Sequence, residues 1–471
     1  MAIDRQEVSL AEPRQQTVPR SPGGTQDIYY ARPASVPLPM IERASGIHMW
    51  DEDGKEYIDA SSGPMVSAIG HGNPRVIEAM AAQAGKLDYA YTRVARNRPN
   101  LDYAARLAAL AGPGFERVNF ASGGSEAVDN ALKFLRQYAL ASGQASRRRM
   151  ISLMPSYHGA TLATLAIGGN DALAPFMAGF AVAADTVPAP FSYRLPGGHS
   201  RESHAVECAG ALDTKIRKLG PENVLAFVIE PVGGISTGAL VPPAQYFRDI
   251  REICSRHGVY LVFDEILCGT GRSGKFITAH HWPEALPDII VLAKGLGAGY
   301  SPLGAMLAPA AMVDELAHLA GCEFSYSANA NPVSCAAGLA VLDEFERLRL
   351  VERARTVGLT LRAGLEAIME RSPILGDVRG LGLLLAVEMV ADKESKTPLP
   401  DELLPTERIR IHGLGNGIML YSRPTAGSRF GHWFLVAPPL TISDEECSEV
   451  LRRTEAAVGD FHAELKTSGA V

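Results

Sequence analysis

The sequence predicts an α/β protein organised around a large, mainly parallel β-sheet. From about residue 100 onward, amphipathic helical segments alternate with short strands of branched apolar residues, the pattern of repeated βαβ units. Three of these strands end in a charged residue, at Glu230, Asp264 and Lys294, spaced 34 and 30 residues apart. One βαβ unit is roughly 30 residues long. The three side chains are therefore expected along the carboxyl edge of the sheet, where open α/β sheets bind ligands.

The first 75 residues predict an arm followed by part of a smaller α+β lobe. Residues 1–25 lack the apolar core of a signal peptide and are expected to form the arm. In residues 26–75, short strands flank the turn dipeptide Asp53-Gly54, which indicates a hairpin. A loop rich in glycine follows the hairpin, and Pro74 then opens a helix.

Residues 76–332 are predicted to form the large domain, and residues 333–471 the C-terminal part of the small one. Helices are expected over Asn100–Ala111 and directly after the segment Ser122–Glu126. A long helix over Ser334–Leu348 opens the C-terminal part. The strands of the large domain are expected at Arg117–Ala121, Met150–Met154, Phe180–Ala183, Val224–Glu230, Val259–Asp264, Ile289–Ala293 and 303–308.

The composition is that of an ordinary soluble globular protein, with 46% hydrophobic and 21% charged residues among 471. A formal net charge of −7 argues against a nucleic-acid surface, and no basic block is present for a membrane. No apolar run is long enough to cross a bilayer. The six cysteines never fall in a C-x-x-C spacing, which indicates reduced thiols rather than a disulfide framework or a zinc site. We therefore expect a cytoplasmic protein that carries no metal and binds neither nucleic acid nor membrane.

The functional interpretation depends on the stretch Ile289–Tyr300. A buried strand there ends in Lys294 and then breaks into glycines, which permit a sharp turn and the close approach of a ligand. A buried ammonium is costly, and a lysine that loses its proton on desolvation is suited to form an imine with an aldehyde. Taken alone, the pattern fits equally well a strand-end lysine whose ammonium reaches solvent.

Four other segments have both a structural and a functional explanation. The buried carboxylate of Asp264 requires a cation, which is either a protonated pyridine nitrogen or an arginine, unless Asp264 caps the next helix. Gly124 and Ser125 lie at a strand-to-helix junction and form an anion site, unless Ser125 only caps the helix. Tyr157 stacks on a flat cofactor or is a surface aromatic. Glu230 ends a strand beside Asp264 and Lys294, and its structural explanation is that it is an ordinary strand-end carboxylate in a salt bridge.

An aldehyde-reactive lysine, a partner for a ring nitrogen, a phosphate cradle and a stacking ring are together the requirements of pyridoxal 5′-phosphate (PLP). The glycines before the helix are not followed by the lysine of a nucleotide-binding P-loop, so ATP is not expected. The sequence therefore predicts PLP as the cofactor.

At these positions the chain resembles the class III aminotransferases, the omega-, ornithine- and GABA-type enzymes of PLP fold type I. The resemblance extends from about Gly46 to Ser443. The segments that carry it are HMWDEDGKEYIDASSGPMVSAIGHGNP, LVFDEILCGTGRSGKF, IIVLAKGLGAGYSPLGA and APPLTISDEE. It implies a large domain with a mainly parallel seven-stranded sheet and a smaller α+β domain built from both chain ends.

The resemblance also implies roles for single residues. Lys294 would carry the cofactor aldehyde and move the proton, and Asp264 would pair with the pyridine nitrogen. A phosphate-binding hydroxyl is implied from the neighbouring subunit five residues before a proline, and counting back from Pro332 gives Ser327. An obligate homodimer with shared active sites follows. The remaining cofactor contacts are implied for residues that pack on the ring, hold the phosphate or border the site: Tyr157, Ile266, Gly124, Ser125 and Glu230.

The chain departs from the family pattern at two places. Leu267 stands where the family often has a glutamine near the phenolic oxygen of the ring. The segment Phe324–Ala328, FSYSA, replaces the family's H-G-x-T-[YF] around Ser327.

The activity implied is a ping-pong transamination from an amine or omega-amino acid donor to a keto acid, with pyruvate as the expected acceptor. Arg423 is the candidate for holding a substrate carboxylate, with Arg429 as a competitor and a surface arginine as the alternative. Glu230 is expected to pair with an arginine and to release it for keto-acid binding. The substrate pocket is expected to include Trp50, Ser62, Met65 and Tyr91.

Other reactions occur on the same scaffold, namely decarboxylation, phospho-lyase action and amino-group migration, and a fold does not fix the reaction. A non-catalytic PLP-binding protein is an alternative of a different class. That alternative predicts the loss of Lys294 or Asp264, and both residues are present.

Overall fold

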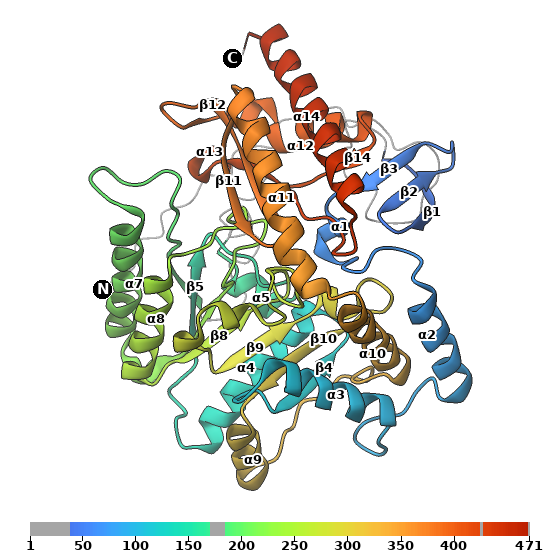
Figure 1. Ribbon diagram of the computed structural model, residues 1–471. Coiled ribbons are helices and arrows are strands. Elements are labelled where there is room, and N and C mark those ends of the chain that lie inside the picture. The colour runs from blue at the N-terminus through green and yellow to red at the C-terminus, as the bar shows by residue number, and fades with distance from the viewer. Residues whose placement is uncertain (1–37, 170–183, 424–426, 470–471) are drawn as a thin grey trace, which may run out of the picture. The chain divides into compact units, whose positions relative to one another are not determined.

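The computed structural model describes residues 38–169, 184–423 and 427–469 (Figure 1). The chain from Ile41 onward folds as one unit, and its described residues form three β-sheets. The arm expected over residues 1–25 and the strand expected at Phe180–Ala183 lie outside the described residues.

The largest sheet has seven strands in the order β4-β10-β9-β8-β7-β5-β6. Neighbouring strands are parallel, except in the two pairs that β10 makes with β9 and β4. Strands β7, β9 and β10 are buried along their whole length, as continuous apolar runs in a sheet covered on both faces should be. The bounds are β4 Arg117–Ala121, β5 Arg149–Met154, β6 Ala184–Pro188, β7 Val224–Ile229, β8 Tyr260–Asp264, β9 Ile289–Leu292 and β10 Gly304–Ala308. The predicted mainly parallel, seven-stranded sheet is confirmed.

Alternate residues of the strands enter two different core clusters, because successive side chains point to opposite faces of a sheet. Phe263 and Leu292 belong to one cluster, while Val262 and Val291 belong to the other. The first cluster includes residues of α3 (Arg98–Ala111), α7 (Arg201–Leu219) and α8 (Ala244–His257); the second includes residues of α4 (Gly124–Ala141), α5 (Leu162–Ile167) and α9 (Ala310–Leu319). Helices therefore cover both faces, with α7 and α8 side by side (Figure 1).

Segments from both chain ends meet in a four-stranded sheet of order β1-β2-β3-β14. Ile418 of β14 pairs in parallel with Ile58 of β3. The bounds are β1 Ile41–Ser45, β2 His48–Asp51, β3 Glu56–Asp59 and β14 Ile418–Met419. This sheet matches the α+β part expected from both chain ends, whose exact boundaries at residues 75 and 333 stay a prediction.

The third sheet lies entirely in the C-terminal region and has the order β11-β12-β16-β15, with β13 paired to β12. Its bounds are β11 Leu375–Leu381, β12 Leu384–Asp392, β13 Thr397–Pro398, β15 Tyr421–Ser422 and β16 His432–Val436. The remaining helices are α1 Ser62–Met65, α2 Pro74–Lys86, α10 Pro332–Arg347, α11 Leu350–Arg371, α12 Pro405–Gly415, α13 Gly427–Phe430 and α14 Asp444–Thr467. The helix expected over Ser334–Leu348 begins at Pro332, because the side chain of Asn331 caps the amides of residues 333 and 334.

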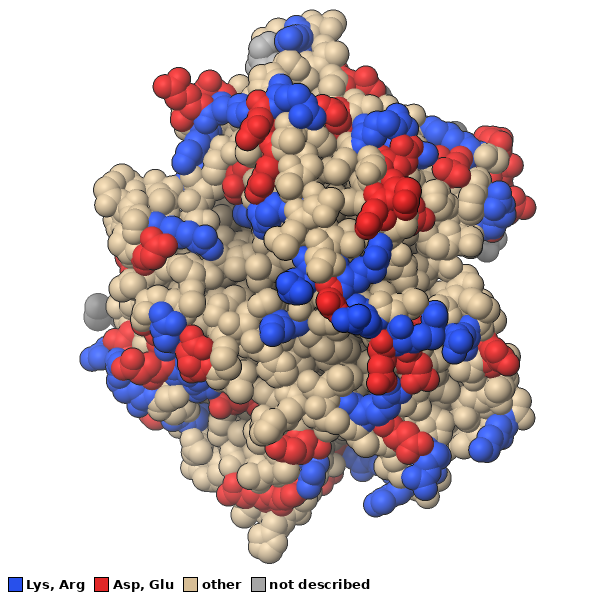
Figure 2. Space-filling model, viewed as in Figure 1, with Lys and Arg blue, Asp and Glu red and all other residues tan. Residues whose placement is uncertain are grey.

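Charged side chains of both signs are interspersed over the face shown in Figure 2. In the described parts of the chain, no helix has the length and apolarity to span a membrane.

Candidate active site

The three strand-end residues do meet at one edge of the large sheet. Strands β7, β8 and β9 are adjacent, and their register places Phe263 opposite Ile229 and Asp264 opposite Val291. The groups that follow these strands, Glu230 and Lys294, therefore flank Asp264. The charges of Glu230 and Asp264 both raise the pKa of Lys294. The three groups therefore lie close together, as the spacings of 34 and 30 residues predicted.

Lys294 is half-buried and adopts a left-handed backbone conformation with φ +48° at the first position of a 3₁₀ turn. Burial lowers the pKa of its ammonium, although the charges of Asp264 and Glu230 oppose that effect. Within the described residues, no group hydrogen-bonds or ion-pairs with its Nζ atom. The amine is thus poised to react rather than held in a structural salt bridge.

Asp264 is 3% exposed, and its carboxylate has two hydrogen-bond donors. The Nδ1 atom of His158 lies 2.9 Å from Asp264 Oδ2, and the backbone amide of Ile266 donates to Oδ1 at 3.1 Å. Burial of the His158 ring opposes its protonation, but the hydrogen bond and charge of Asp264 outweigh burial and raise the pKa of His158. His158 Nε2 is buried and has no partner among the described residues. The sequence suggested only that His158 adjoins Tyr157, so this contact was missed.

The neighbouring carboxylate of Glu265 points away from this edge, as alternation along a strand requires. It accepts hydrogen bonds from the backbone amides of Thr278 and Ala279, at 2.5 and 2.7 Å. Burial raises the pKa of Glu265 to about 7. Asp264 and Glu265 therefore serve different parts of the molecule.

The carboxylate of Glu230 is hydrogen-bonded to the loop that carries Tyr157, the candidate for stacking on the cofactor ring. Its Oε2 accepts the amide of Tyr157 at 3.2 Å and its Oε1 accepts the amide of Gly234 at 2.9 Å. Burial is the main reason that the pKa of Glu230 rises to about 7. Glu230 and Arg423 do not form an ion pair in this structure, so the expected exchange of an arginine partner stays a prediction.

The sequence predicted an anion cradle at the first turn of α4, and this role stays a prediction. Gly123, not Ser125, is the N-cap, and no side chain caps the helix. Ser125 Oγ instead accepts the amide of Ala160 at 3.0 Å, which ties the helix start to the loop of Tyr157. A methyl group on Gly124 would lie 2.9 Å from the Cδ1 atom of Ile266, so glycine lets these two segments approach closely.

Tyr157 lies at the rim of this site with 37% of its surface exposed. Burial raises the pKa of its hydroxyl, and the charge of Arg423 opposes that effect, so the two side chains are electrostatically coupled. Arg423 itself is exposed. The guanidinium of Arg429 lies 4.8 Å from the ring of Phe430. The charge of Arg423 therefore reaches Tyr157, and which arginine binds a substrate carboxylate stays a prediction.

The other predicted contacts lie in three different places. Ser327 is exposed, and its carbonyl accepts the hydroxyl of Tyr89 at 3.0 Å. The Trp50 ring is covered by the Arg43 guanidinium at 3.8 Å. The rest of the expected pocket lies on the loops after β3 and α2: Ser62 and Met65, both 1% exposed, and Tyr91, which is half-buried. Their roles stay predictions.

Comparison with known proteins gives a consistent result. The sequence model of the family "Aminotransferase class-III" matches residues 29–458. The chain is 33% identical to the uncharacterized aminotransferase YodT of Bacillus subtilis, over 91% of this chain and 96% of that protein. Its fold is similar to that of a PLP-bound amine transaminase from an uncultivated Pseudomonas species, with a TM-score of 0.85, 34% identity and coverage of 96% and 99%. The omega transaminase of Pseudomonas jessenii in complex with PMP is similar with a TM-score of 0.84, 30% identity and coverage of 91% and 94%.

Proposed function

The chain belongs to the class III aminotransferases, enzymes that use PLP, and we propose that it moves an amino group from an amine or omega-amino acid to a keto acid, with pyruvate as the acceptor. The observation that carries this proposal is the Lys294 amine, which has a lowered pKa and no partner in the described part of the chain, beside the buried carboxylate of Asp264. A reactive amine and a buried acceptor for a cation are not needed together for folding.

The side chains at this edge fit PLP in their chemistry. Asp264 is a buried carboxylate that suits a protonated pyridine nitrogen. The uncapped amides at the start of α4, with the hydroxyl of Ser125, suit a phosphate. Gly124 leaves no Cβ in that cradle, and Tyr157 and Ile266 are the candidates for packing on the two faces of the ring.

When bound, PLP supplies an aldehyde for the amino group and a ring that withdraws electrons from the reacting carbon. Lys294 is assigned to take the proton from the α-carbon of the donor and to return it one atom away, and its lowered pKa favours the neutral amine that this task needs. Asp264 would hold a proton on the ring nitrogen of the bound cofactor, and His158 hydrogen-bonds Asp264 and so fixes the orientation of its carboxylate. Arg423 is assigned to the carboxylate of the keto acid. In the second half-reaction the same groups act in the reverse order.

We further propose a cytoplasmic homodimer with shared active sites. The exposed position of Ser327, away from the chain's own core, supports a role toward the neighbouring subunit. The proposal assigns Ser327 to the phosphate in the partner's site.

A screen of amine donors against keto-acid acceptors on the purified, PLP-loaded protein tests the proposed function. We expect equal amounts of a new amino acid and of the carbonyl product of the donor. We also expect Lys294→Ala to abolish turnover together with the absorbance band of lysine-linked PLP. Carbon dioxide, phosphate or an isomerised amino acid as the main product would instead favour decarboxylation, phospho-lyase action or amino-group migration. Normal turnover by Lys294→Ala would refute the assignment of that residue.

A further inference from the structure

The turn formed by residues 269–272, in the loop after β8, contains a threonine in a backbone conformation that threonine rarely adopts. The amide of Arg272 donates to the carbonyl of Gly269 at 3.3 Å, and both central residues have positive φ angles, +49° at Thr270 and +81° at Gly271. Turns in which both central residues have positive φ, as in type I′, favour asparagine, aspartate or glycine there. For a residue branched at Cβ, such a φ is an outlier. Thr270 is therefore unfavourable for the turn that it occupies.

Hydrogen bonding does not account for this threonine. Thr270 is 2% exposed, and its Oγ1 atom is buried without a hydrogen-bond partner among the described residues. A buried hydroxyl that makes no hydrogen bond lowers stability. Strained residues persist only where their surroundings enforce them, and they gather at functional sites. The reason for a threonine here therefore lies in what its carbon atoms contact.

The carbon atoms of Thr270 pack against Gly295, the residue that directly follows the reactive lysine. A methyl group added to Gly295 would lie 3.3 Å from Cβ and 3.5 Å from Cγ2 of Thr270. The same methyl group would lie 3.5 Å from the Cβ atom of Ala68. Two side chains thus meet at the position where any other residue would place its own Cβ atom, and they restrict how the backbone at Gly295 can move.

The backbone at Lys294 depends on such a support. Lys294 has φ +48°, and Ala298 at the other end of the turn has the same value. The carbonyl of Lys294 accepts the amides of Gly297 at 3.2 Å and Ala298 at 2.9 Å, which closes the turn on its far side. Because no described residue holds the Nζ atom by a hydrogen bond or an ion pair, the direction of the lysine side chain depends on this backbone and on the contacts at Gly295.

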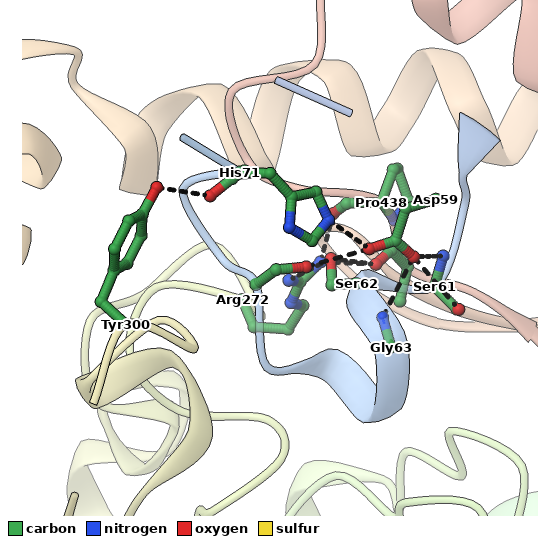
Figure 3. Close-up of polar contacts among 11 residues, drawn as sticks. Asp59, Ser61, Ser62, Gly63, His71, Arg272, Tyr300 and Pro438 are labelled. Carbon is green, nitrogen blue, oxygen red and sulfur yellow. Dashed lines mark hydrogen bonds and ion pairs between the residues drawn. The ribbon is translucent and has the colours of Figure 1, made fainter. Parts of the chain in front are cut away.

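The turn that carries Thr270 is anchored through Arg272 (Figure 3). The guanidinium is buried and donates to Oγ of Ser62 at 3.1 Å and to the carbonyl of Pro438 at 2.5 Å. Burial lowers the pKa of Arg272 to about 10, and the charge of Asp59 opposes that effect, so the guanidinium stays charged at neutral pH. It ties the turn to the segments after β3 and after β16, and Thr270 is therefore fixed relative to both.

We propose that Thr270 is a positioning residue whose side chain braces Gly295 and thereby sets the direction in which Lys294 points. The inference rests on the proposed function, because it concerns the lysine that is assigned there to the proton transfer. It accounts for a threonine where the turn favours glycine or asparagine, because local stability is given up for the geometry of the reactive amine. The sequence indicated that the glycines after Lys294 permit close approach, but it did not indicate that a threonine of the preceding loop approaches them.

Substitutions at Thr270 separate the brace from the hydroxyl. Thr270→Val keeps both carbon contacts and removes only the hydroxyl, so kcat should stay at the wild-type level. Thr270→Ala keeps only the Cβ contact, and Thr270→Gly removes both contacts. Because a misplacement of reacting groups by about 1 Å can lower a rate by on the order of a hundredfold, we expect kcat to fall by roughly tenfold to a hundredfold in Thr270→Gly and by less in Thr270→Ala.

The stability of Thr270→Gly should not follow its activity. Glycine adopts a positive φ without strain and carries no buried hydroxyl, so this variant should unfold at the wild-type temperature or above it. A residue with only a structural role would lose stability and activity together. Leu404→Gly is the matched control, because Leu404 has the same φ of +49° in an exposed position at the start of α12. The control should leave kcat unchanged.

An exchange of side chains between the two positions tests the contact directly. Gly295→Ala alone should lower kcat by roughly tenfold or more, because its methyl group would press on Thr270 at 3.3 Å. The φ of Gly295 lies outside the left-handed region, so its backbone accepts alanine. In the double variant Thr270→Gly/Gly295→Ala, the methyl group occupies the space that the threonine leaves, and kcat should recover above both single variants.

Circular dichroism in the absorbance band of lysine-linked PLP provides a readout that does not depend on turnover. The signal reports how the cofactor is held on the lysine, so it should weaken in Thr270→Gly, return in the double variant and stay unchanged in Thr270→Val and Leu404→Gly. If the wild-type enzyme converts no amine, the proposed function fails, while the circular dichroism still decides on the brace.

Three results would overturn the proposal: wild-type kcat and circular dichroism in Thr270→Gly, a loss in Thr270→Val as large as in Thr270→Gly, or no recovery in the double variant. If Thr270→Gly does not fold, Thr270→Ala and Gly295→Ala decide by the same two measurements.

Discussion

Replacement of His158 by leucine is the perturbation that most directly tests how the site is held. The ring of His158 is fully buried, and its Nδ1 atom lies 2.9 Å from Oδ2 of Asp264. In the variant, Oδ2 loses this donor while Oδ1 keeps the amide of Ile266 at 3.1 Å. A lost hydrogen bond to a buried charged group costs about 1.5–3 kcal/mol. We expect the free energy of unfolding to fall by about that amount.

The same loss should reduce turnover. Without His158, Oδ2 of Asp264 has lost its hydrogen-bond donor and the carboxylate can rotate, so its hold on a pyridinium nitrogen weakens. If the whole free energy of the lost hydrogen bond were added to the activation free energy, kcat would fall by roughly tenfold to a hundredfold. His158→Gln retains a donor and should recover part of the loss.

The pH dependence follows from the raised pKa of His158 in the folded protein. A histidine whose pKa is higher when folded contributes stability that is complete below the unfolded value of about 6.5. That contribution is lost as the pH rises through the folded value. The difference in unfolding free energy between the wild type and His158→Leu should therefore be largest near pH 6 and become smaller at alkaline pH.

Urea unfolding of both proteins across this pH range, together with steady-state kinetics, measures these effects. The reasoning would be refuted if His158→Leu had wild-type kcat, or if the stability difference stayed constant or grew with pH. His257→Leu, which breaks a histidine–aspartate pair far from the strand ends, controls for general destabilisation.

Three further predictions concern single positions. Gly124→Ala should weaken PLP binding by roughly tenfold in equilibrium dialysis, because its methyl would lie 2.9 Å from a neighbouring isoleucine, whereas Gly85→Ala, with open space at its Cβ, should have no effect. Arg423→Ala should raise KM for pyruvate and leave a plain aldehyde acceptor unaffected; equal losses for both acceptors would argue against a carboxylate clamp. Ser327→Ala and Lys294→Ala should each be impaired as homodimers, and refolding them together should restore activity in mixed dimers if Ser327 acts in the partner's site. No gain on mixing would place Ser327 within its own subunit.

The framework of this site was predictable because it depends on strong local patterns. Buried strands of isoleucine, valine and phenylalanine each stop at a charged residue, and their spacing matches one crossover unit. Parallel strands in register then bring Glu230, Asp264 and Lys294 together without any contact specific to the family. The order and spacing of the strands along the chain were therefore enough to predict which residues meet at this edge of the sheet.

The residues that were missed act through long-range side-chain contacts. His158 meets Asp264 across 106 residues of sequence, and no periodic pattern records that the ring turns inward rather than outward. The two-residue strand β14 is too short to have a period, although it joins the C-terminal region to β3. Asp59 resembles any aspartate at a strand end until the turn of the following loop brings His71 back to it.

This division has a consequence for how the enzyme can vary. Lys294 and Asp264 are fixed by buried strands in a sheet packed on both faces, where even small displacements are costly. The loop Ala60–Gly72, which includes the predicted pocket residues Ser62 and Met65, is buried as well: Met65 packs in the main core cluster and Ala68 in a second one. Substitutions at the strand ends should therefore abolish both turnover and the absorbance of lysine-linked PLP.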